Sequence, residues 1–236
     1  MSDRRHPAAL PKYVQIAEML IRDIAAGRLA DGARLPPERE MAEGLGIAVG
    51  TLRHALGVLV EKHLLERVQG SGNYVRARSD VSSVYSFLRI EKIGGGGLPT
   101  AEVLAIDRLP APEEAGFAVQ EGFRFRRLRF MDNVPAAMEE IWLDGAVTTH
   151  VDAAAVSESL YLYYSQALGV VITSAEDRVS VAPAPDWVDA RFGLKAGEMA
   201  GYIERTGRMH NGATVEFSKT WFDPRRINYV ARLGKS

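Results

Sequence analysis

Apolar residues recur every three or four positions through the first third of the chain, a spacing that predicts amphipathic helices. In the first of these segments the apolar positions are Tyr13, Ile16, Leu20 and Ile24. The predicted helices cover residues 12–26, 36–44 and 48–62, and the predicted extended segments that follow cover residues 64–68 and 73–77. A glycine-containing turn joins the two extended segments, so this part of the chain is predicted as three helices closed by a hairpin.

Alternation of apolar and polar residues at period two takes over in the remaining two thirds and predicts strands. The predicted strands cover residues 101–109, 123–131, 136–142, 170–182, 199–210 and 214–222, and the predicted short helices cover residues 112–119, 157–168 and 187–192. Hairpin-joined strands with helices between them predict an antiparallel α+β domain over residues 86–236. The polar stretch at residues 78–85 is predicted to link it to an N-terminal domain over residues 1–77.

The composition is that of an ordinary globular protein, with 47% hydrophobic and 25% charged residues among 236. No apolar run approaches the roughly 20 residues of a membrane helix, and the charged first residues do not resemble a signal peptide. The chain has no cysteine, and its five histidines lack metal-ligand spacing. We therefore expect a cytoplasmic protein without a metal or a cofactor.

The charge balance does not by itself indicate a DNA-binding protein, because the formal net charge is −1. Residues 1–80 hold 12 Lys and Arg against 10 Asp and Glu, a balance of +2. Residues 81–236 hold 17 against 20, a balance of −3. Any contact with DNA phosphates must therefore come from cations that are clustered on one face.

Three helices followed by a hairpin are the layout of a winged helix-turn-helix, which places one helix in the DNA major groove. Residues 11–77 resemble the N-terminal domain of GntR-type transcriptional regulators. The matching segments are Leu35-Pro36-Pro37-Glu38-Arg39-Glu40, Thr51-Leu52-Arg53-His54-Ala55-Leu56 and Gln69-Gly70-Ser71-Gly72-Asn73-Tyr74-Val75. The resemblance implies a DNA-binding domain whose contacts are made by Arg39, Val49, Thr51, Arg53, Gly70, Ser71 and Gly72.

Arginine suits these positions because its planar fork reaches guanine O6 and N7 or clamps a phosphate. By the resemblance, Arg39 and Arg53 contact the operator, Thr51 contacts a phosphate, and the glycines of the hairpin approach the minor groove. The competing interpretation is that Arg39 and Arg53 are solvated helix charges.

The chain departs from the family at the start of the third helix, where Ala48-Val49 stands in place of the usual Ser-Arg. One bidentate base contact is worth about 1–3 kcal/mol of discrimination. We therefore expect an operator that differs from the family's usual one at the base pair facing Val49. Two helix-capping serines are also replaced, by Pro37 and Ala48, at a cost of up to about 1 kcal/mol each.

In the second domain, Arg127 and Arg129 lie two residues apart on one predicted strand and so project to the same face. Two guanidiniums on one sheet face form a seat for a carboxylate or a phosphate. Glu139 is on the neighbouring strand and Glu216 on the last one. The competing interpretation is that these residues form cross-strand ion pairs on a solvated sheet face.

This domain resembles the UTRA effector-binding domain of the HutC subfamily, which has a chorismate-lyase-like α+β fold. The resemblance implies dimerisation and an effector site. Its implied effector-binding residues are Ser86, Arg127, Arg129, Glu139, Ser159, Tyr161, Glu216 and Phe222. The residues expected in the core instead are Trp142, Trp187, Trp221, Phe123, Phe125 and Phe130.

Together the two resemblances predict a one-component regulator, a repressor that binds a palindromic operator as a homodimer. A small anionic effector, such as a sugar phosphate, an amino-acid derivative or another carboxylate, is expected to release the DNA. The alternative is a lyase-like enzyme or a metabolite-binding protein that uses the second domain. Fold does not carry function, and the attached DNA-binding domain argues against an enzyme.

Overall fold

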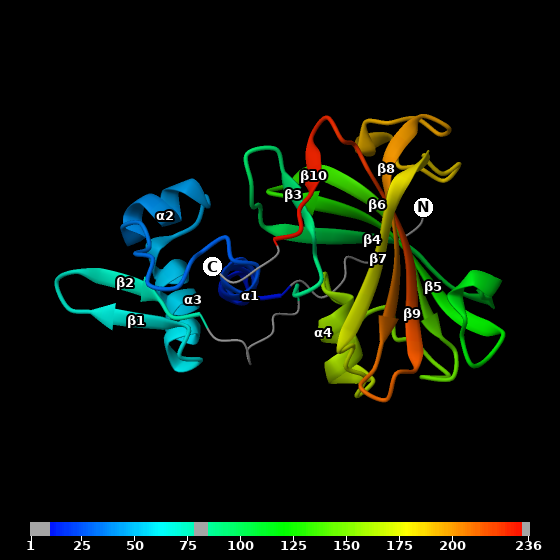
Figure 1. The fold of residues 1–236 in the computed structure, drawn as a ribbon, viewed down its shortest axis with the longest axis horizontal. Coiled ribbons are helices and arrows are strands. Elements are labelled where there is room, and N and C mark those ends of the chain that lie inside the picture. Colours follow the sequence, from blue (N-terminus) through cyan, green and yellow to red (C-terminus); the bar gives the residue numbers. More distant parts are fainter. Residues whose placement is uncertain (1–9, 78–84, 233–236) are drawn as a thin grey trace. The chain divides into compact units, whose positions relative to one another are not determined.

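The computed structural model describes residues 10–77 and 85–232, which divide into two compact units. The described part of one unit comprises residues 10–77, 85–89 and 230–232, and the described part of the other comprises residues 90–229. Most of the predicted linker at 78–85 lies outside the described residues. Figure 1 shows helices and a hairpin in the first unit and a broad sheet in the second.

The first unit contains α1 (Lys12–Ala25), α2 (Glu38–Gly44) and α3 (Val49–Glu61), followed by the hairpin of β1 (Leu65–Val68) and β2 (Gly72–Val75). The two strands are antiparallel. The core of this unit is made of apolar residues that recur at helical spacing, including Ile16, Leu20, Leu52, Leu56 and Leu59. The predicted winged helix-turn-helix layout is thus present.

The second unit is built on a six-stranded antiparallel sheet with the strand order β4-β5-β6-β9-β8-β7. The strands are β4 (Pro99–Pro110), β5 (Glu121–Met131), β6 (Val134–Asp144), β7 (Ser174–Pro183), β8 (Met199–Arg208) and β9 (Thr214–Phe222). A separate two-stranded sheet pairs β3 (Ile90–Lys92) with β10 (Ile227–Tyr229). The α+β class and the antiparallel sheet agree with the prediction.

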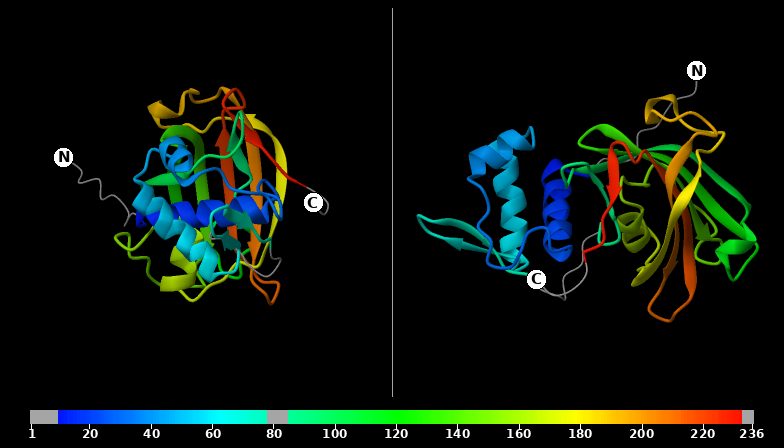
Figure 2. Two further views of the ribbon diagram at one scale, coloured as in Figure 1. Left: turned by 90° about the vertical axis from the view of Figure 1, so that its left-hand side faces the viewer. Right: turned by 45° about the horizontal axis from the view of Figure 1, so that its top comes forward.

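The helix α4 (Leu160–Ala167) packs on one face of the large sheet, as Figures 1 and 2 show. Tyr164 of this helix lies in a cluster with Phe125 of β5 and Ile141 of β6. The opposite face carries a second apolar cluster that includes Leu128 and Trp221. Successive side chains along each strand therefore point alternately into cores on the two faces of the sheet. The pairing register between strands decides which residues of different strands share a face.

Five of the six expected core aromatics lie in or against these two clusters, and Trp142 lies in a third one with Phe217. Trp142, Trp221, Phe123 and Phe125 are buried. Trp187 and Phe130 are partly buried and pack against the cluster around Trp221.

Several predicted elements differ in length from the observed ones. The predicted helices at 112–119 and 187–192 are single 3-10 turns, η1 (Glu113–Ala115) and η2 (Ala190–Phe192). Each turn ends at a glycine in the left-handed region, Gly116 at φ 62° and Gly193 at φ 92°, which stops helical propagation. The strand predicted from residue 170 begins at Ser174.

The strands β3 and β10 were not predicted from the sequence. They are three residues long, and their pairing joins segments more than 130 positions apart, so no local periodicity reveals them. No single helix in the described ranges is long and apolar enough to cross a membrane, although the bent pair of α2 and α3 passes that test on length and composition when taken together.

Candidate functional site

The first candidate surface is formed by α2, α3 and the hairpin. Arg53 projects from the first turns of α3 with 67% of its side chain exposed. Its Nε donates to Glu38 Oε2 at 2.6 Å, which ties the guanidinium to the first residue of α2. Arg39 is exposed one residue further along α2. Both predicted arginines therefore lie at the N-terminal ends of adjacent helices, and Arg53 is oriented by a carboxylate.

Both helices begin without a side-chain cap. The N-cap residues are Pro37 for α2 and Ala48 for α3, and neither supplies a side-chain acceptor. Val49 is the first residue of α3 and is partly exposed. Thr51 lies in the same first turn. An apolar side chain thus occupies the leading end of the helix that the fold presents for groove insertion.

Glycines shape the hairpin tip. Gly70 has φ 74° and Gly72 has φ 134°, which are conformations that side-chain-bearing residues rarely adopt. Ser71 lies between them, with its hydroxyl 2.7 Å from the Tyr74 hydroxyl. The tip is therefore compact and polar, as the approach of a protein backbone to a DNA groove requires.

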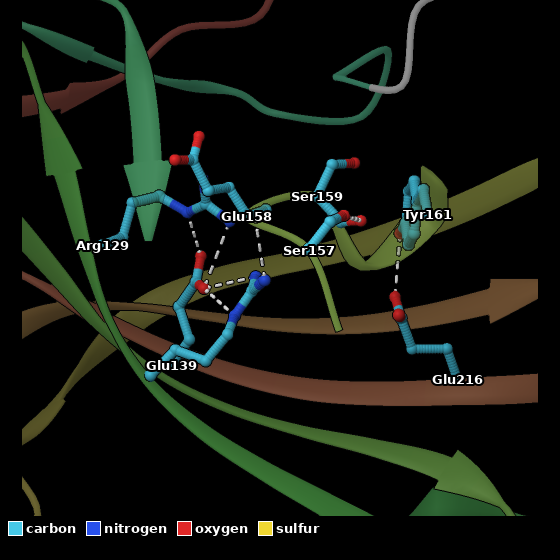
Figure 3. Close-up of polar contacts among 8 residues, drawn as sticks. Arg129, Glu139, Ser157, Glu158, Ser159, Tyr161 and Glu216 are labelled. Atoms are coloured by element: carbon cyan, nitrogen blue, oxygen red, sulfur yellow. Dashed lines mark hydrogen bonds and ion pairs between the residues drawn. The ribbon is translucent and has the colours of Figure 1, made fainter. Parts of the chain in front are cut away.

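The second candidate site is an ion cluster on the face of the large sheet that α4 covers (Figure 3). Glu139 lies directly across from Arg127 in the β5–β6 register. Arg127 donates to Glu139 Oε2 from Nε at 3.0 Å and from Nη2 at 2.6 Å. Arg129 Nε donates to Glu139 Oε1 at 2.5 Å. One carboxylate thus accepts from two guanidiniums.

This cluster is buried, with side-chain exposures of 3% for Arg127 and 6% for both Arg129 and Glu139. Burial by itself would raise the pKa of Glu139, but the two guanidiniums outweigh it and hold that pKa at about 2. The cross-strand ion pairs that were considered as an alternative to ligand binding are therefore present. The sheet face that carries them is buried and not solvated, however.

The two guanidiniums have more donors than Glu139 can accept. Arg127 Nη1 donates to the backbone oxygen of Glu158 at 3.2 Å. Arg129 Nη1 is buried without a hydrogen-bond partner among the described residues. An unused charged donor in a buried position is costly unless an acceptor binds there.

The segment that enters α4 lies beside the ion cluster. Ser159 caps the helix, since its Oγ accepts from Leu162 N at 3.3 Å. Ser157 Oγ donates to the backbone oxygen of Ser159 at 2.6 Å. Figure 3 shows both serines on the stretch that leads into α4 and to Tyr161. The positive end of the α4 dipole therefore faces the same region as the arginines.

Tyr161 and Glu216 form a second polar pair on this face. The Tyr161 hydroxyl donates to Glu216 Oε1 at 2.8 Å. Burial raises the pKa of Glu216 to about 7, against the opposing effect of the Tyr161 hydrogen bond and the Arg205 charge. Burial and the neighbouring Glu216 raise the pKa of Tyr161 well above its usual value. Glu216 can therefore either donate or accept a proton near neutral pH.

Arg205 and Asp177 belong to this site but were missed by the sequence analysis. Arg205 donates to the two Asp177 oxygens from Nε at 2.6 Å and Nη2 at 2.7 Å. The Tyr229 hydroxyl donates to Asp177 Oδ2 at 2.8 Å. Arg205 lies opposite Ser218 in the β8–β9 register and close enough to Tyr161 and Glu216 to affect their pKa values. Counting back from the Asn211-Gly212 turn could have revealed its face.

Phe222 is buried on the same face, two positions along from Thr220, which pairs with Glu139. Its ring lies over Gly201, where a Cβ atom would come within 2.3 Å of the Phe222 Cζ. Seven of the eight predicted effector residues therefore lie in the unit of residues 90–229. Ser86 belongs to the other unit.

The described parts of the chain contain no group of three or more His, Cys, Asp or Glu side chains that could hold a metal ion. The chemistry of the buried face is accordingly that of guanidiniums, carboxyls and hydroxyls. Such groups bind and orient a polar ligand.

A winged helix-turn-helix followed by a sheet domain with a buried polar face is an arrangement typical of transcriptional regulators. Residues 12–75 match the profile of bacterial regulatory proteins of the gntR family, and residues 95–228 match the UTRA domain. The chain belongs to the GntR family of transcriptional regulators and carries a UTRA domain. Since this family consists of regulators, the protein is a regulator and the lyase-like alternative is not supported.

Similar proteins cover nearly the whole chain. The HTH-type transcriptional regulator SmoD of Agrobacterium fabrum is 53% identical over 227 residues, which span 95% of this chain and 97% of SmoD. The mannosyl-D-glycerate transport/metabolism system repressor MngR of Escherichia coli is 29% identical, over 90% of this chain and 92% of MngR. The crystal structure of the possible transcriptional regulator YydK of Bacillus subtilis has the same fold, with a TM-score of 0.53 and 22% identity over 95% of this chain and 100% of YydK.

Proposed function

We propose that this protein is a one-component repressor that binds a palindromic operator as a homodimer and is released by a small anionic effector. The observation that carries the effector proposal is the buried cluster of Arg127, Arg129 and Glu139, in which Arg129 keeps a charged N–H without an acceptor among the described residues. We also propose a cytoplasmic location, because operator DNA is there. The relative MngR is named a repressor, which supports the direction of control.

On the DNA side, we assign contacts to Arg39, Thr51 and Arg53 and to the hairpin tip at residues 70–72. Glu38 holds the Arg53 guanidinium at the end of α2, which reduces its rotamer freedom before it meets DNA. Val49 offers a methyl surface in place of a guanidinium, and such a surface fits a thymine methyl group. We therefore expect an altered base preference at that position.

On the effector side, we assign the ligand's acidic group to Arg129 and to the start of α4 at Ser159. A carboxylate, phosphate or sulfonate oxygen would accept from Arg129 Nη1 in a charge-assisted hydrogen bond, which is stronger than a bond to a neutral acceptor. Hydroxyl groups on the part of the ligand away from its acidic group would find hydrogen-bond donors and acceptors at Glu216, Tyr161 and Arg205. The Phe222 ring supplies an apolar contact beside them.

Sugar phosphates, amino-acid derivatives and other carboxylates satisfy this arrangement. The system that names the relative MngR involves mannosyl-D-glycerate, a glycoside of a hydroxy acid. Sugar-linked acids are therefore the first compounds to test. Any of them releases DNA only if it binds the DNA-free arrangement of the two units more tightly than the DNA-bound one.

The test is a thermal-shift screen of anionic metabolites on the full chain, followed by DNA-release assays with the hits. Arg129→Gln is expected to abolish both the ligand-induced rise in Tm and the release, while operator binding is kept. The matched control is Arg126→Gln, because Arg126 lies on the same strand, faces the opposite side and pairs with Glu140 at 2.9 Å. Arg127 is a poorer choice since its removal also disturbs the Glu158 backbone.

An unchanged ligand response in Arg129→Gln would contradict the assignment of the effector site. Simultaneous loss of operator binding and ligand response in that variant, with Arg126→Gln intact, would assign Arg129 a folding role instead.

A further inference from the structure

The cations of the DNA-binding unit fall into two groups. Among residues 10–77, the ion-paired cations and their carboxylates are Arg22 and Arg28 with Asp23, Arg53 with Glu38, and Arg76 with Glu66. No ion pair is found within the described residues for Lys12, Arg34, Arg39, Lys62 and Arg67. Residues 10–77 hold nine Lys and Arg against eight Asp and Glu, so affinity for DNA phosphates depends on which of the unpaired cations lie at the DNA-binding surface.

Arg34 is distinguished from the others by its place beside the hairpin. Leu35 N donates to Asn73 O and Val75 N donates to Ala33 O, both at 2.9 Å, so this segment lies alongside β2 as a single antiparallel bridge. Arg34 pairs with Tyr74 across that junction. Directly paired residues project to the same side of a sheet, so the Arg34 side chain lies on the face of Tyr74 and Gly72.

The guanidinium of Arg34 rests on the backbone of the hairpin tip. A Cβ atom at Gly72 would lie 3.3 Å from Arg34 Nε and 3.9 Å from its Cζ, closer than most side-chain contacts allow. The absence of a side chain at Gly72 therefore leaves room for the planar fork. The backbone pairing of residues 33–35 fixes the base of this side chain, and its guanidinium lies against Gly72.

We propose that Arg34 is a further DNA-contacting residue, which places its guanidinium in the minor groove beside the hairpin tip. A narrow minor groove over A·T pairs concentrates negative potential and favours inserted arginine over lysine. The recognition helix of this chain has an apolar residue at Val49, which cannot make the bidentate base contact of an arginine. Part of the sequence preference is thereby shifted from the major groove at α3 to the minor groove at Arg34.

The experiment uses the full-length protein without effector. Wild-type protein selects duplexes from a randomised library, and fluorescence anisotropy then measures the affinity for one selected duplex at several KCl concentrations. Arg34→Ala is expected to weaken binding about tenfold and to lower the slope of log K against log salt by about one per bound chain. Lys62→Ala is the matched control, because it removes an exposed, unpaired cation at the C-terminal cap of α3 and should leave both quantities unchanged.

Arg34→Lys separates readout of the groove from simple charge. This variant should keep the salt slope but lose the preference for A·T over G·C pairs beneath the tip. Three outcomes overturn the proposal: Arg34→Ala binding within twofold of wild type, equal losses in Arg34→Ala and Lys62→Ala, or an undiminished A·T preference in Arg34→Lys. If circular dichroism shows that Arg34→Ala does not fold, the A·T preference of Arg34→Lys alone tests the proposal.

Discussion

Glu139 and Glu216 lie on one buried sheet face, yet their surroundings favour opposite protonation states. Two guanidiniums contact Glu139 and keep its pKa at about 2. Glu216 is contacted by a tyrosine hydroxyl, which stabilises a carboxylate less than a direct guanidinium does, so burial prevails and raises its pKa to about 7. The partner groups, more than the degree of burial, decide which of the two carboxyls titrates near neutral pH.

This difference predicts a pH-dependent contribution of Glu216 to stability. The pKa is raised from 4.5 in a model compound to about 7 in the folded protein, so the contribution is present in full below pH 4.5. It is lost as the pH rises through 7. Glu216→Gln, which mimics the protonated acid, should match wild type at pH 4.5 and exceed it at pH 8 by a free energy of unfolding on the order of a few kcal/mol.

Urea denaturation of both proteins between pH 4.5 and 8 measures the effect as a difference between variant and wild type. Glu140→Gln, on the opposite sheet face and paired with Arg126, is the control. A Glu216→Gln difference that does not change with pH would show that Glu216 keeps an ordinary pKa.

At the scale of single elements, α3 is a recognition helix that starts without a cap. Ala48 has extended backbone angles, φ −68° and ψ 143°, which suit a capping residue, but its side chain cannot accept a hydrogen bond. The backbone N–H groups of the first turn are among the donors that a helix leaves unpaired. The helix is instead held by burial of Leu52, Leu56 and Leu59.

Ala48→Ser should therefore stabilise the DNA-binding unit by about 0.5–1 kcal/mol, because the hydroxyl can accept from an N–H of the first turn. Chemical denaturation followed by circular dichroism measures the change. Ala26→Ser is the control, since Ala26 is the C-cap of α1, where no free N–H needs an acceptor. Equal gains in both variants would exclude capping as the cause.

The sheet shows where local patterns stop being informative. Period-two alternation predicted β5 and β9 almost to their observed ends, since alternation is a direct result of strand geometry. The same signal extended β7 to residue 170, because Val170 and Val171 are apolar although they precede the strand. Gly201 provides another example: its role is to leave space for Phe222, a residue on the neighbouring strand.

At the scale of the whole molecule, two copies of the winged helix-turn-helix related by a twofold axis should read two inverted half-sites. We expect the selected duplexes to be pseudo-palindromes whose half-site centres lie about 10–10.5 base pairs apart, or a multiple of that spacing. Sequencing of the selected pool gives the spacing, and analytical ultracentrifugation gives the number of chains per duplex. A single chain on a non-palindromic site would contradict the homodimer proposal.

The sequence by itself predicted a winged helix-turn-helix ahead of an antiparallel α+β domain, most of the longer helices and strands, and the paired arginines, because each follows from spacing over a few residues. It could not show that Arg127 and Arg129 share one buried carboxylate, or that Asp177 holds Arg205 beside Glu216. It also could not show that Arg34 rests on Gly72, nearly forty positions away. These contacts depend on the hydrogen-bonded register between strands, which only the folded chain fixes.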